Sequence, residues 1–564
     1  MSQVAAPTPL NEELIKLRRE GEERAAKRLG GELGYPYVDI GKTPASFEAV
    51  TAIPEPQARE ALAVGLERGD RTLAVAVADP RLPPTLRLLV ELRKQFPALK
   101  VVIASRSGIA QLWHMYSFSV KEAKGITGKV EFEARLAELM RKLPNFRAVK
   151  EAFGALDFAK ESTTDFLEML LAGALANEAS DVHCEAEEEQ AKFRFRIDGR
   201  LHDVATNIPL KNYEALLARF KLLAGLKINV RDEAQDGRFT VRAASDKEIE
   251  IRVSIVPSEF GETVVMRILD PKEIILTFAD LGLREDDLVI VNAELAKPNG
   301  LILNTGPTGS GKTTTLYAFL RKLNDPEVKI ITVEDPIEYR VEGIEQTQVD
   351  AEAGYTFASG LRAIVRQDPD VVLVGEIRDT ETADIALQAA LTGHLVLSTL
   401  HTNDAVGAVP RLTNLGVKPA TIGAAVSLVI AQRLVRKLCE KCKKEVPLTP
   451  ETEAHIASFL KRIPSRVDRA PYAHPTLFEP AGCGACNHFG YKGRIGIFEF
   501  FRGGLELEEV ILQEVAETVL VQLAVKQGMV RMQEDGVLKA LRGLTSLKEV
   551  EEVTGPLEWQ STGI

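Results

Sequence analysis

The sequence predicts an α/β protein whose largest domain is a parallel sheet wound by helices. Three observations support this fold class. Strand and helix patterns alternate over residues 301–405, the order expected when crossover helices join parallel strands. A glycine-rich loop at residues 306–313 stands between an apolar strand and a helix-prone segment. Residues 163–269 contain a helix and several strands, which indicates a smaller α+β domain before the large one.

The N-terminal part predicts a separate α/β domain over residues 1–150. The chain has 564 residues, and at roughly 100 to 200 residues per domain we expect three or four folding units. A helical period at residues 11–29 is followed by strand-like segments at 72–77 and 100–104. Residues 146–162 are expected to form a linker, because their apolar residues follow no sustained period.

The second domain is expected over residues 151–275. A helix is predicted at 163–177 and an alternating strand at 192–197, with further strands at 248–256 and 263–269. These elements together indicate a compact α+β domain.

The third domain is expected over residues 285–564. Its end, from about residue 506, is predicted to be helical. Ser546 and Glu549 form a capping signature before the last helix.

The glycine-rich loop matches the phosphate-binding pattern G-x-x-x-x-G-K-[ST]. Its backbone N–H groups can surround phosphates, Lys312 can place a positive charge on the β and γ oxygens, and Thr313 offers a hydroxyl to magnesium. An ordinary glycine turn is the alternative. The nucleotide contacts expected here are Gly306, Pro307, Thr308, Gly309, Ser310, Gly311, Lys312, Thr313 and Thr314.

Hydrolysis also requires a carboxylate at the end of a neighbouring strand. Four apolar residues at 371–374 predict a buried strand, and Glu376 follows where that strand ends. Glutamate stands here where aspartate is more usual, and a solvated loop acid is the alternative to a catalytic one.

Two more segments are expected at the same edge of the sheet. The strand at 329–333 ends in acids, among them Glu334, Asp335 and Glu338, which could supply a general base. The strand at 393–401 is flanked by His394 and His401, which could sense the γ-phosphate. Taken singly, each acid could simply face solvent, and each histidine fits a structural role at least as well as a catalytic one. The order of these residues along one sheet favours a catalytic site.

Four of the five cysteines form two Cys-x-x-Cys pairs, a spacing that lets both thiolates of a pair bind one tetrahedral ion. The pairs are Cys439 with Cys442 and Cys483 with Cys486. Forty residues separate them, so a looped insertion must return the chain. We expect one zinc ion per subunit; reduced thiols or a redox pair are the alternatives. Cys184 stands alone and is expected to be a small buried side chain.

Charge and hydropathy restrict the partners. The net charge is −11, which disfavours nucleic acid as the main partner. The longest apolar stretches fall short of the roughly 18 residues that a membrane span needs. Residues 1–10 lack a secretory pattern, so we expect a cytoplasmic protein whose membrane contact comes through partners.

These motifs together resemble the secretion ATPases that power type IV pilus assembly and type II secretion, the PilB/GspE group. The resemblance covers about residues 163–555, with the matching segments in family order. These segments are Ala179-Ser-Asp-Val-His183, residues 219–238 ending in Gln235-Asp-Gly-Arg238, Gly306 to Thr313, Ile331-Thr-Val-Glu-Asp-Pro-Ile-Glu338, Arg366-Gln-Asp-Pro-Asp370 with Gly375-Glu376, and Thr392-Gly-His394 through Leu400-His401-Thr.

The resemblance implies an architecture. It implies a RecA-like motor domain that hydrolyses ATP with Mg²⁺, preceded by a PAS-like α+β domain. Residues 1–150 would be a docking domain like that of type II secretion ATPases. A four-cysteine zinc element at residues 439–497 would be inserted in the motor.

The resemblance also implies roles for the site residues. Lys312 and Thr313 would hold phosphate and magnesium, Glu376 would be the Walker B acid, and Glu338 would activate water. The remaining residues would act around them: Glu334 and Asp335 would support the site, His394 and His401 would form the histidine box, and Arg219, Arg231 and Arg238 would reach the nucleotide. The family usually carries two adjacent arginines where this chain has Arg231-Asp232, and a proline where it has Ala234.

By the same resemblance, the protein is expected to be a homo-hexamer that acts on an inner-membrane platform protein at the inner face of the plasma membrane. The cysteine element followed by Gly490-Tyr-Lys-Gly-Arg494-x-Gly496 is typical of assembly and secretion ATPases and missing from retraction ATPases. The element therefore favours assembly or export over retraction, and pilus assembly is the function we expect. The alternatives are type II secretion, a catalytically weak scaffold, and a nucleic-acid translocase.

Overall fold

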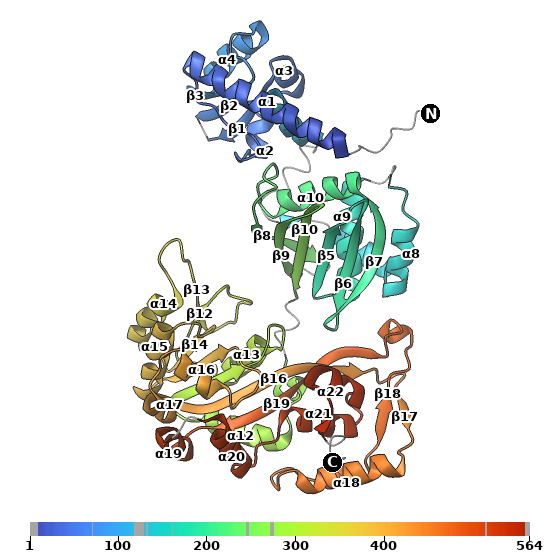
Figure 1. Ribbon diagram of the computed structural model, residues 1–564, viewed down its shortest axis with the longest axis vertical. Helices are drawn as coiled ribbons and strands as arrows, with labels where there is room; N and C mark the ends of the chain where they lie inside the picture. Colours follow the sequence, from blue (N-terminus) through green and yellow to red (C-terminus); the bar gives the residue numbers. More distant parts are fainter. Residues whose placement is uncertain are drawn as a thin grey trace. The chain divides into compact units, whose positions relative to one another are not determined.

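The structure of the protein, a computed structural model (Figure 1), forms two compact units, Met1–Leu269 and Asp270–Ile564. The described residues are 9–558 except 70, 118–128, 131–132, 159, 161, 244–246, 271–275 and 514–515. Within this part of the chain, no helix is both long and apolar enough to cross a bilayer.

The first unit begins with a three-stranded sheet in the order β1-β2-β3. β1 and β2 are antiparallel, whereas β2 and β3 are parallel and are joined by a helix, as a parallel pair requires. The helix and both strands expected in this part are found as α1, β2 and β3. The elements are α1 (Pro9–Leu33), α2 (Phe47–Val50), α3 (Glu55–Glu60), β1 (Ala63–Arg68), β2 (Thr72–Val77), α4 (Pro83–Gln95), β3 (Ala98–Ile103), α5 (Arg106–Leu112) and η1 (Trp113–Ser117).

A seven-stranded sheet follows in the same unit, in the order β4-β8-β9-β10-β5-β6-β7. Along β6, Phe193, Phe195 and Ile197 are buried and alternate with partly exposed residues, as the sequence predicted. Helices cover the apolar face, and Phe166 of α9 stacks on Phe193 with ring centroids 5.5 Å apart. The elements are β4 (Lys129–Val130), α7 (Glu133–Lys142), α8 (Phe146–Gly154), α9 (Thr163–Ala176), β5 (Asp181–Ala186), β6 (Gln190–Ile197), β7 (Arg200–Pro209), α10 (Leu210–Leu223), β8 (Gln235–Ala243), β9 (Lys247–Ser258) and β10 (Gly261–Leu269).

The linker expected at residues 146–162 is wrong for its first nine residues, which form α8. The side chain of Asn145 accepts a hydrogen bond from the Ala148 N–H and caps the helix. Phe146, Val149 and Phe153 are buried on one helix face. Their spacing is helical, but the run is too short for a sustained period to stand out.

The second unit is built on a seven-stranded sheet in the order β13-β12-β14-β15-β11-β16-β19. All neighbouring pairs are parallel except β16 with β19. Separate apolar clusters lie on the two faces, which explains why β11, β14 and β15 are buried throughout. The elements up to the end of the parallel region are α11 (Phe278–Leu281), α12 (Glu285–Leu295), β11 (Gly300–Thr305), α13 (Lys312–Leu323), β12 (Ile330–Glu334), β13 (Glu345–Gln348), α14 (Phe357–Ile364), η3 (Val365–Gln367), β14 (Val371–Val374), α15 (Thr380–Leu391), β15 (Leu395–Leu400), α16 (Ala408–Asn414), α17 (Pro419–Ala425) and β16 (Val426–Leu438).

The predicted insertion lies between β16 and β19, and four helices close the chain. Ser546 caps the last of them by accepting a hydrogen bond from the Glu549 N–H, as its signature predicted. These elements are β17 (Lys444–Val446), α18 (Pro450–Arg462), η4 (Ala470–Tyr472), β18 (Leu477–Glu479), η5 (Gly484–Cys486), β19 (Tyr491–Arg502), α19 (Leu505–Gln513), α20 (Glu517–Lys526), α21 (Met532–Leu541) and α22 (Leu547–Thr554).

Candidate functional site

The phosphate loop joins β11 to α13 at the carboxyl edge of the parallel sheet. Gly306, Gly309 and Gly311 have φ values of 145°, 78° and 87°, which side chains with a Cβ rarely adopt. Lys312 is the first residue of α13. The loop thus presents a helix N-terminus and its N–H groups to an anion, as the motif predicted.

Lys312 is folded back on its own loop. Its Nζ donates to the carbonyl oxygens of Gly306 at 2.8 Å and Pro307 at 3.1 Å. Burial lowers the pKa of this ammonium group, while the charge of Glu376 opposes that shift. A phosphate is a stronger acceptor than a carbonyl, so the ammonium group has a better partner whenever nucleotide is bound.

Glu376 lies just beyond β14, two strands along from the loop. Its carboxylate is 2.6 Å from the Arg378 guanidinium and 3.6 Å from His401 Nε2. The side chain of Glu376 is only 13% exposed, whereas that of Arg378 is 68% exposed. Arg378 can therefore leave Glu376 at little cost, because an ion pair with one solvated partner is weak.

His401 is held at the same edge by the loop after β15. Thr402 N–H donates to Thr305 Oγ1 at 2.7 Å, which joins this loop to the end of β11. Burial and the charge of Lys312 lower the pKa of His401, whereas Glu376 opposes the shift.

His394 lies at the opposite edge of the sheet. It precedes β15, and its carbonyl accepts from the N–H of Gly300, the first residue of β11. Its Nδ1 is 3.0 Å from the Ala389 carbonyl oxygen. The structure therefore brings Lys312, Thr313, Glu376 and His401 to one edge, and it does not bring His394 there.

Glu334 is the buried centre of a hydrogen-bond network at the end of β12. It accepts from Thr332 Oγ1 at 2.6 Å, from Gln346 Nε2 at 3.2 Å and from the hydroxyl of Tyr317. Gln346 Nε2 also donates to the Tyr339 carbonyl at 2.8 Å. The network thus fixes Tyr339, the residue next to Glu338. Glu338 itself is partly exposed. Asp335, the next residue after Glu334, is exposed.

The three arginines predicted to reach the nucleotide lie in the first unit and differ in exposure. Arg219 is buried in α10, at 5% exposure. The side chains of Arg231 and Arg238 are 63% and 69% exposed, and they form ion pairs with Glu214 and Glu250 respectively.

Sequence reasoning missed two side chains at this site. Arg378 pairs with Glu376, and Tyr317 hydrogen-bonds with Glu334. Arg378 stands two residues after the strand-end acid, so its position in the same loop was a usable signal. Tyr317 is one turn into α13 and carried no signal, because an aromatic residue on an amphipathic helix usually belongs to the core.

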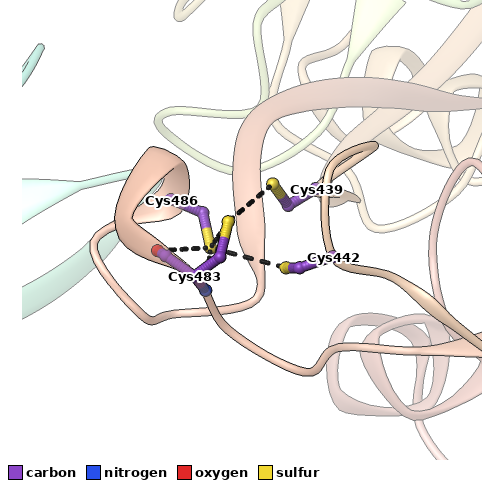
Figure 2. Close-up of side chains that lie close together, drawn as sticks. All are labelled: Cys439, Cys442, Cys483 and Cys486. Atoms are coloured by element: carbon purple, nitrogen blue, oxygen red, sulfur yellow. Dashed lines mark hydrogen bonds between the residues drawn. The ribbon is translucent and has the colours of Figure 1, made fainter.

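The four paired cysteines form one cluster, as Figure 2 shows. Their Sγ atoms all lie within 4.8 Å of one another. Three Sγ–Sγ distances are 3.9 Å (Cys439 to Cys483), 3.7 Å (Cys442 to Cys486) and 3.8 Å (Cys483 to Cys486). Thiolates bound tetrahedrally to zinc at about 2.3 Å lie about 3.8 Å apart. The donor set and its spacing therefore fit zinc.

Backbone donors favour a thiolate at Cys486, whereas burial raises the pKa of Cys439 and Cys442. The N–H groups of Cys483 and Gly490 lie 3.2 Å and 3.3 Å from the sulfur of Cys486. Burial opposes ionisation of Cys486, but these hydrogen bonds, together with those from the side chains of Cys442 and Cys483, lower its pKa to about 7. Such N–H donors stabilise a metal-bound thiolate from outside the ligand shell.

Comparisons with known proteins agree with this geometry. The family described as "Type II/IV secretion system protein" matches residues 159–552, and the MshEN domain matches residues 33–122. The Type IV pilus assembly ATPase PilB of Myxococcus xanthus is 35% identical over 553 residues, 97% of this chain and 94% of the relative. Type II secretion system protein E of Pseudomonas aeruginosa is 47% identical over 386 residues, 68% of this chain and 74% of the relative.

The fold is also found among solved structures. The X-ray structure of the Legionella pneumophila ATPase DotB matches with a TM-score of 0.51 at 22% identity, covering 70% of this chain and 96% of that chain. This likeness concerns the fold, and it confirms the predicted α/β class with a RecA-like ATPase domain. The chain belongs to the Type II/IV secretion system protein family and is an ATPase.

Proposed function

We propose that this chain hydrolyses ATP to ADP and phosphate to power the assembly of type IV pili. The observation that supports this most is the similarity to a pilus assembly ATPase along nearly the whole of both chains. Type II secretion is the second candidate function, favoured by the higher identity to protein E over the 386 residues that align.

Each site residue has a separate role in the proposed hydrolysis. Lys312 neutralises charge on the β and γ phosphates, and Glu338 orients the attacking water. Thr313 and Glu376 supply the hydroxyl and carboxylate oxygens that magnesium prefers, and Glu376 already accommodates a positive charge, that of Arg378. Magnesium bound there would offset negative charge on the phosphates. Glu334 contributes by holding the segment next to Glu338.

The proposed assembly is a homo-hexamer in which each motor packs on the preceding domain of its neighbour. Arg231 and Arg238 are exposed, as side chains that reach a neighbour's nucleotide must be. The role of Arg219 at the nucleotide stays a prediction, as does that of His394. The cysteine cluster is proposed to hold one zinc ion per subunit.

The proposed partner is an inner-membrane platform protein, reached from the cytoplasmic face. A scaffold without catalysis would not need Lys312, Thr313 and Glu376 at one sheet edge. A nucleic-acid translocase is disfavoured by the net charge of −11, because phosphate binding requires cationic surfaces.

Complementation in the source organism tests the proposal. Glu376→Ala should abolish steady-state ATP hydrolysis, and a strain that depends on this variant should lack surface pili while its secreted proteins are unchanged. Glu381→Ala is the matched control, since this glutamate is 61% exposed on α15. Loss of secretion with normal pili would contradict pilus assembly and support the second candidate.

A further inference from the structure

A buried polar side chain, Gln432 of β16, lies beneath the phosphate loop. It is 1% exposed. Its Oε1 accepts from Asn304 Nδ2 at 2.9 Å and from Thr315 Oγ1 at 2.8 Å. Asn304 is on β11, two residues before the loop, and Thr315 is in the first turn of α13, just after it. One side chain therefore connects the two flanks of the loop.

Gln432 also contacts the loop itself. Its main-chain carbonyl oxygen lies 2.4 Å from the position that a Cβ on Gly306 would take, and its side-chain Nε2 lies 2.8 Å from the equivalent position on Gly311. Both distances are too short for a real Cβ. The first and last glycines of the loop are thus seated directly on this one residue.

The surroundings make a glutamine here unusual on packing grounds. Its neighbours Ile430 and Ala431 on β16 are fully buried apolar residues, and Gln432 itself pairs with the fully buried Phe498 of β19. A methionine of similar volume would fill the space without burying an amide, which is costly unless it is hydrogen-bonded. A methionine side chain would not replace the hydrogen bonds that Gln432 Oε1 accepts from Asn304 and Thr315.

We propose that Gln432 is a positioning residue for nucleotide binding. By joining the end of β11 to the start of α13, it holds the loop so that its N–H groups converge on the phosphates before nucleotide arrives. Donors arranged in advance bind an anion without a cost of reorganisation. The proposal concerns nucleotide binding alone, so it holds whichever cargo the motor moves.

The expected kinetic signature is a change in affinity rather than in turnover. The loop holds phosphates in the ground state and in the transition state, so its distortion weakens both equally. KM and the Kd for ADP should rise together, while kcat at saturating ATP is retained.

The experiment uses the full chain and Gln432→Met. Titration with ADP and magnesium should give a Kd about tenfold higher than wild type, about 1.4 kcal/mol. KM for ATP should rise by a similar factor, with kcat within about twofold. Ser427→Ala is the matched control, because Ser427 also joins β16 to β11, at the far end of the strand, through a hydrogen bond to Leu301. Its Kd should equal that of wild type.

A second pair of variants covers the case in which Gln432→Met does not fold. Thr315→Val removes one donor to Gln432 and should raise the Kd for ADP severalfold, and Thr315→Ser should restore it because the hydroxyl is kept. An unchanged Kd in folded Gln432→Met or in Thr315→Val would overturn the proposal. So would a loss of kcat with KM unchanged, since that result places the effect in the transition state.

Discussion

Asp287 is a buried carboxylate whose environment makes the stability of the second unit depend on pH. Its Oδ1 lies 2.8 Å from Arg284 and 2.9 Å from Arg466, and among the described residues its Oδ2 has no hydrogen-bond partner. Burial raises the pKa of Asp287 to about 6; Arg284 opposes this and the nearby Asp535 adds to it. The folded protein therefore binds a proton at Asp287 at a pH where the unfolded chain has released it.

The sign of the effect follows from that difference. Between about pH 4 and 6 the Asp287 carboxyl group binds more protons in the folded state than in the unfolded state. The stability that this group contributes is therefore present below that range and is lost as pH rises through 6. We expect Asp287→Asn to lower the free energy of unfolding at both pH values. The decrease should be about 1 kcal/mol smaller at pH 7 than at pH 5. Thermal unfolding at the two pH values measures this. A difference from wild type that does not change with pH would contradict it.

At the scale of single residues, sequence patterns predicted the site where a motif dictates the chemistry. The position of Lys312, Thr313 and Glu376 at the carboxyl edge of the sheet could be predicted, because each lies shortly after a recognisable strand. The predicted parallel order places only His401, which follows its strand, at the carboxyl edge. His394 precedes that strand, so its expected position at the same edge is wrong. Gln432 could not be found, because its partners are more than a hundred residues away in sequence.

At the scale of elements, β16 and β19 form an antiparallel ribbon that passes the phosphate loop at Gln432. Their pairing extends from Leu428 with Arg502 to Leu438 with Tyr491. Beyond that end, Cys439 N–H donates to the Gly490 carbonyl at 3.0 Å, so the cysteine cluster closes the ribbon. The spacing within each pair predicted the cluster, whereas the looped insertion expected between the pairs gave no indication of its helix and short strands.

We expect zinc to stabilise this insertion rather than the sheet. Cys442→Ser should lose the bound metal and expose residues 444–480 to proteolysis, because the affinity of the thiolates for zinc contributes to folding. Elemental analysis should give one zinc per wild-type subunit. Cys184→Ala is the control, since this cysteine is fully buried in β5 and should leave the metal content unchanged. Wild-type protein without zinc would contradict the assignment.

At the scale of the whole molecule, the arginine proposed to act at the motor site comes from the other unit of the chain. Arg231 belongs to the first unit and lies on a loop held from beneath: buried Lys221 donates to the Val230 carbonyl at 2.6 Å, and Gln235 Nε2 donates to it at 2.9 Å. The backbone of the loop is therefore held in place, while the side chain of Arg231 is exposed. The sequence alone could not predict this support, because a buried lysine in α10 carries no recognisable pattern.

Arg231→Ala should lower turnover by a factor on the order of 10³, the size associated with an arginine that stabilises transferred phosphate, and leave the Kd for ADP measurable. Its exposed pair with Glu214 at 3.7 Å contributes little to stability, so the variant should fold. Lys227→Ala, on the same loop and 48% exposed, is the matched control and should keep its activity.

Mixed assemblies test whether this arginine acts between subunits. Arg231→Ala subunits keep an intact phosphate loop, and Lys312→Ala subunits keep an intact Arg231. If the arginine serves a neighbour, mixing the two inactive variants creates interfaces that hold both groups, and ATP hydrolysis returns as the subunits exchange. If it serves its own chain, every site in the mixture lacks one group and activity stays at the level of the separate variants. We expect activity to return, since an exposed arginine on a fixed loop is suited to reach a second copy of the chain.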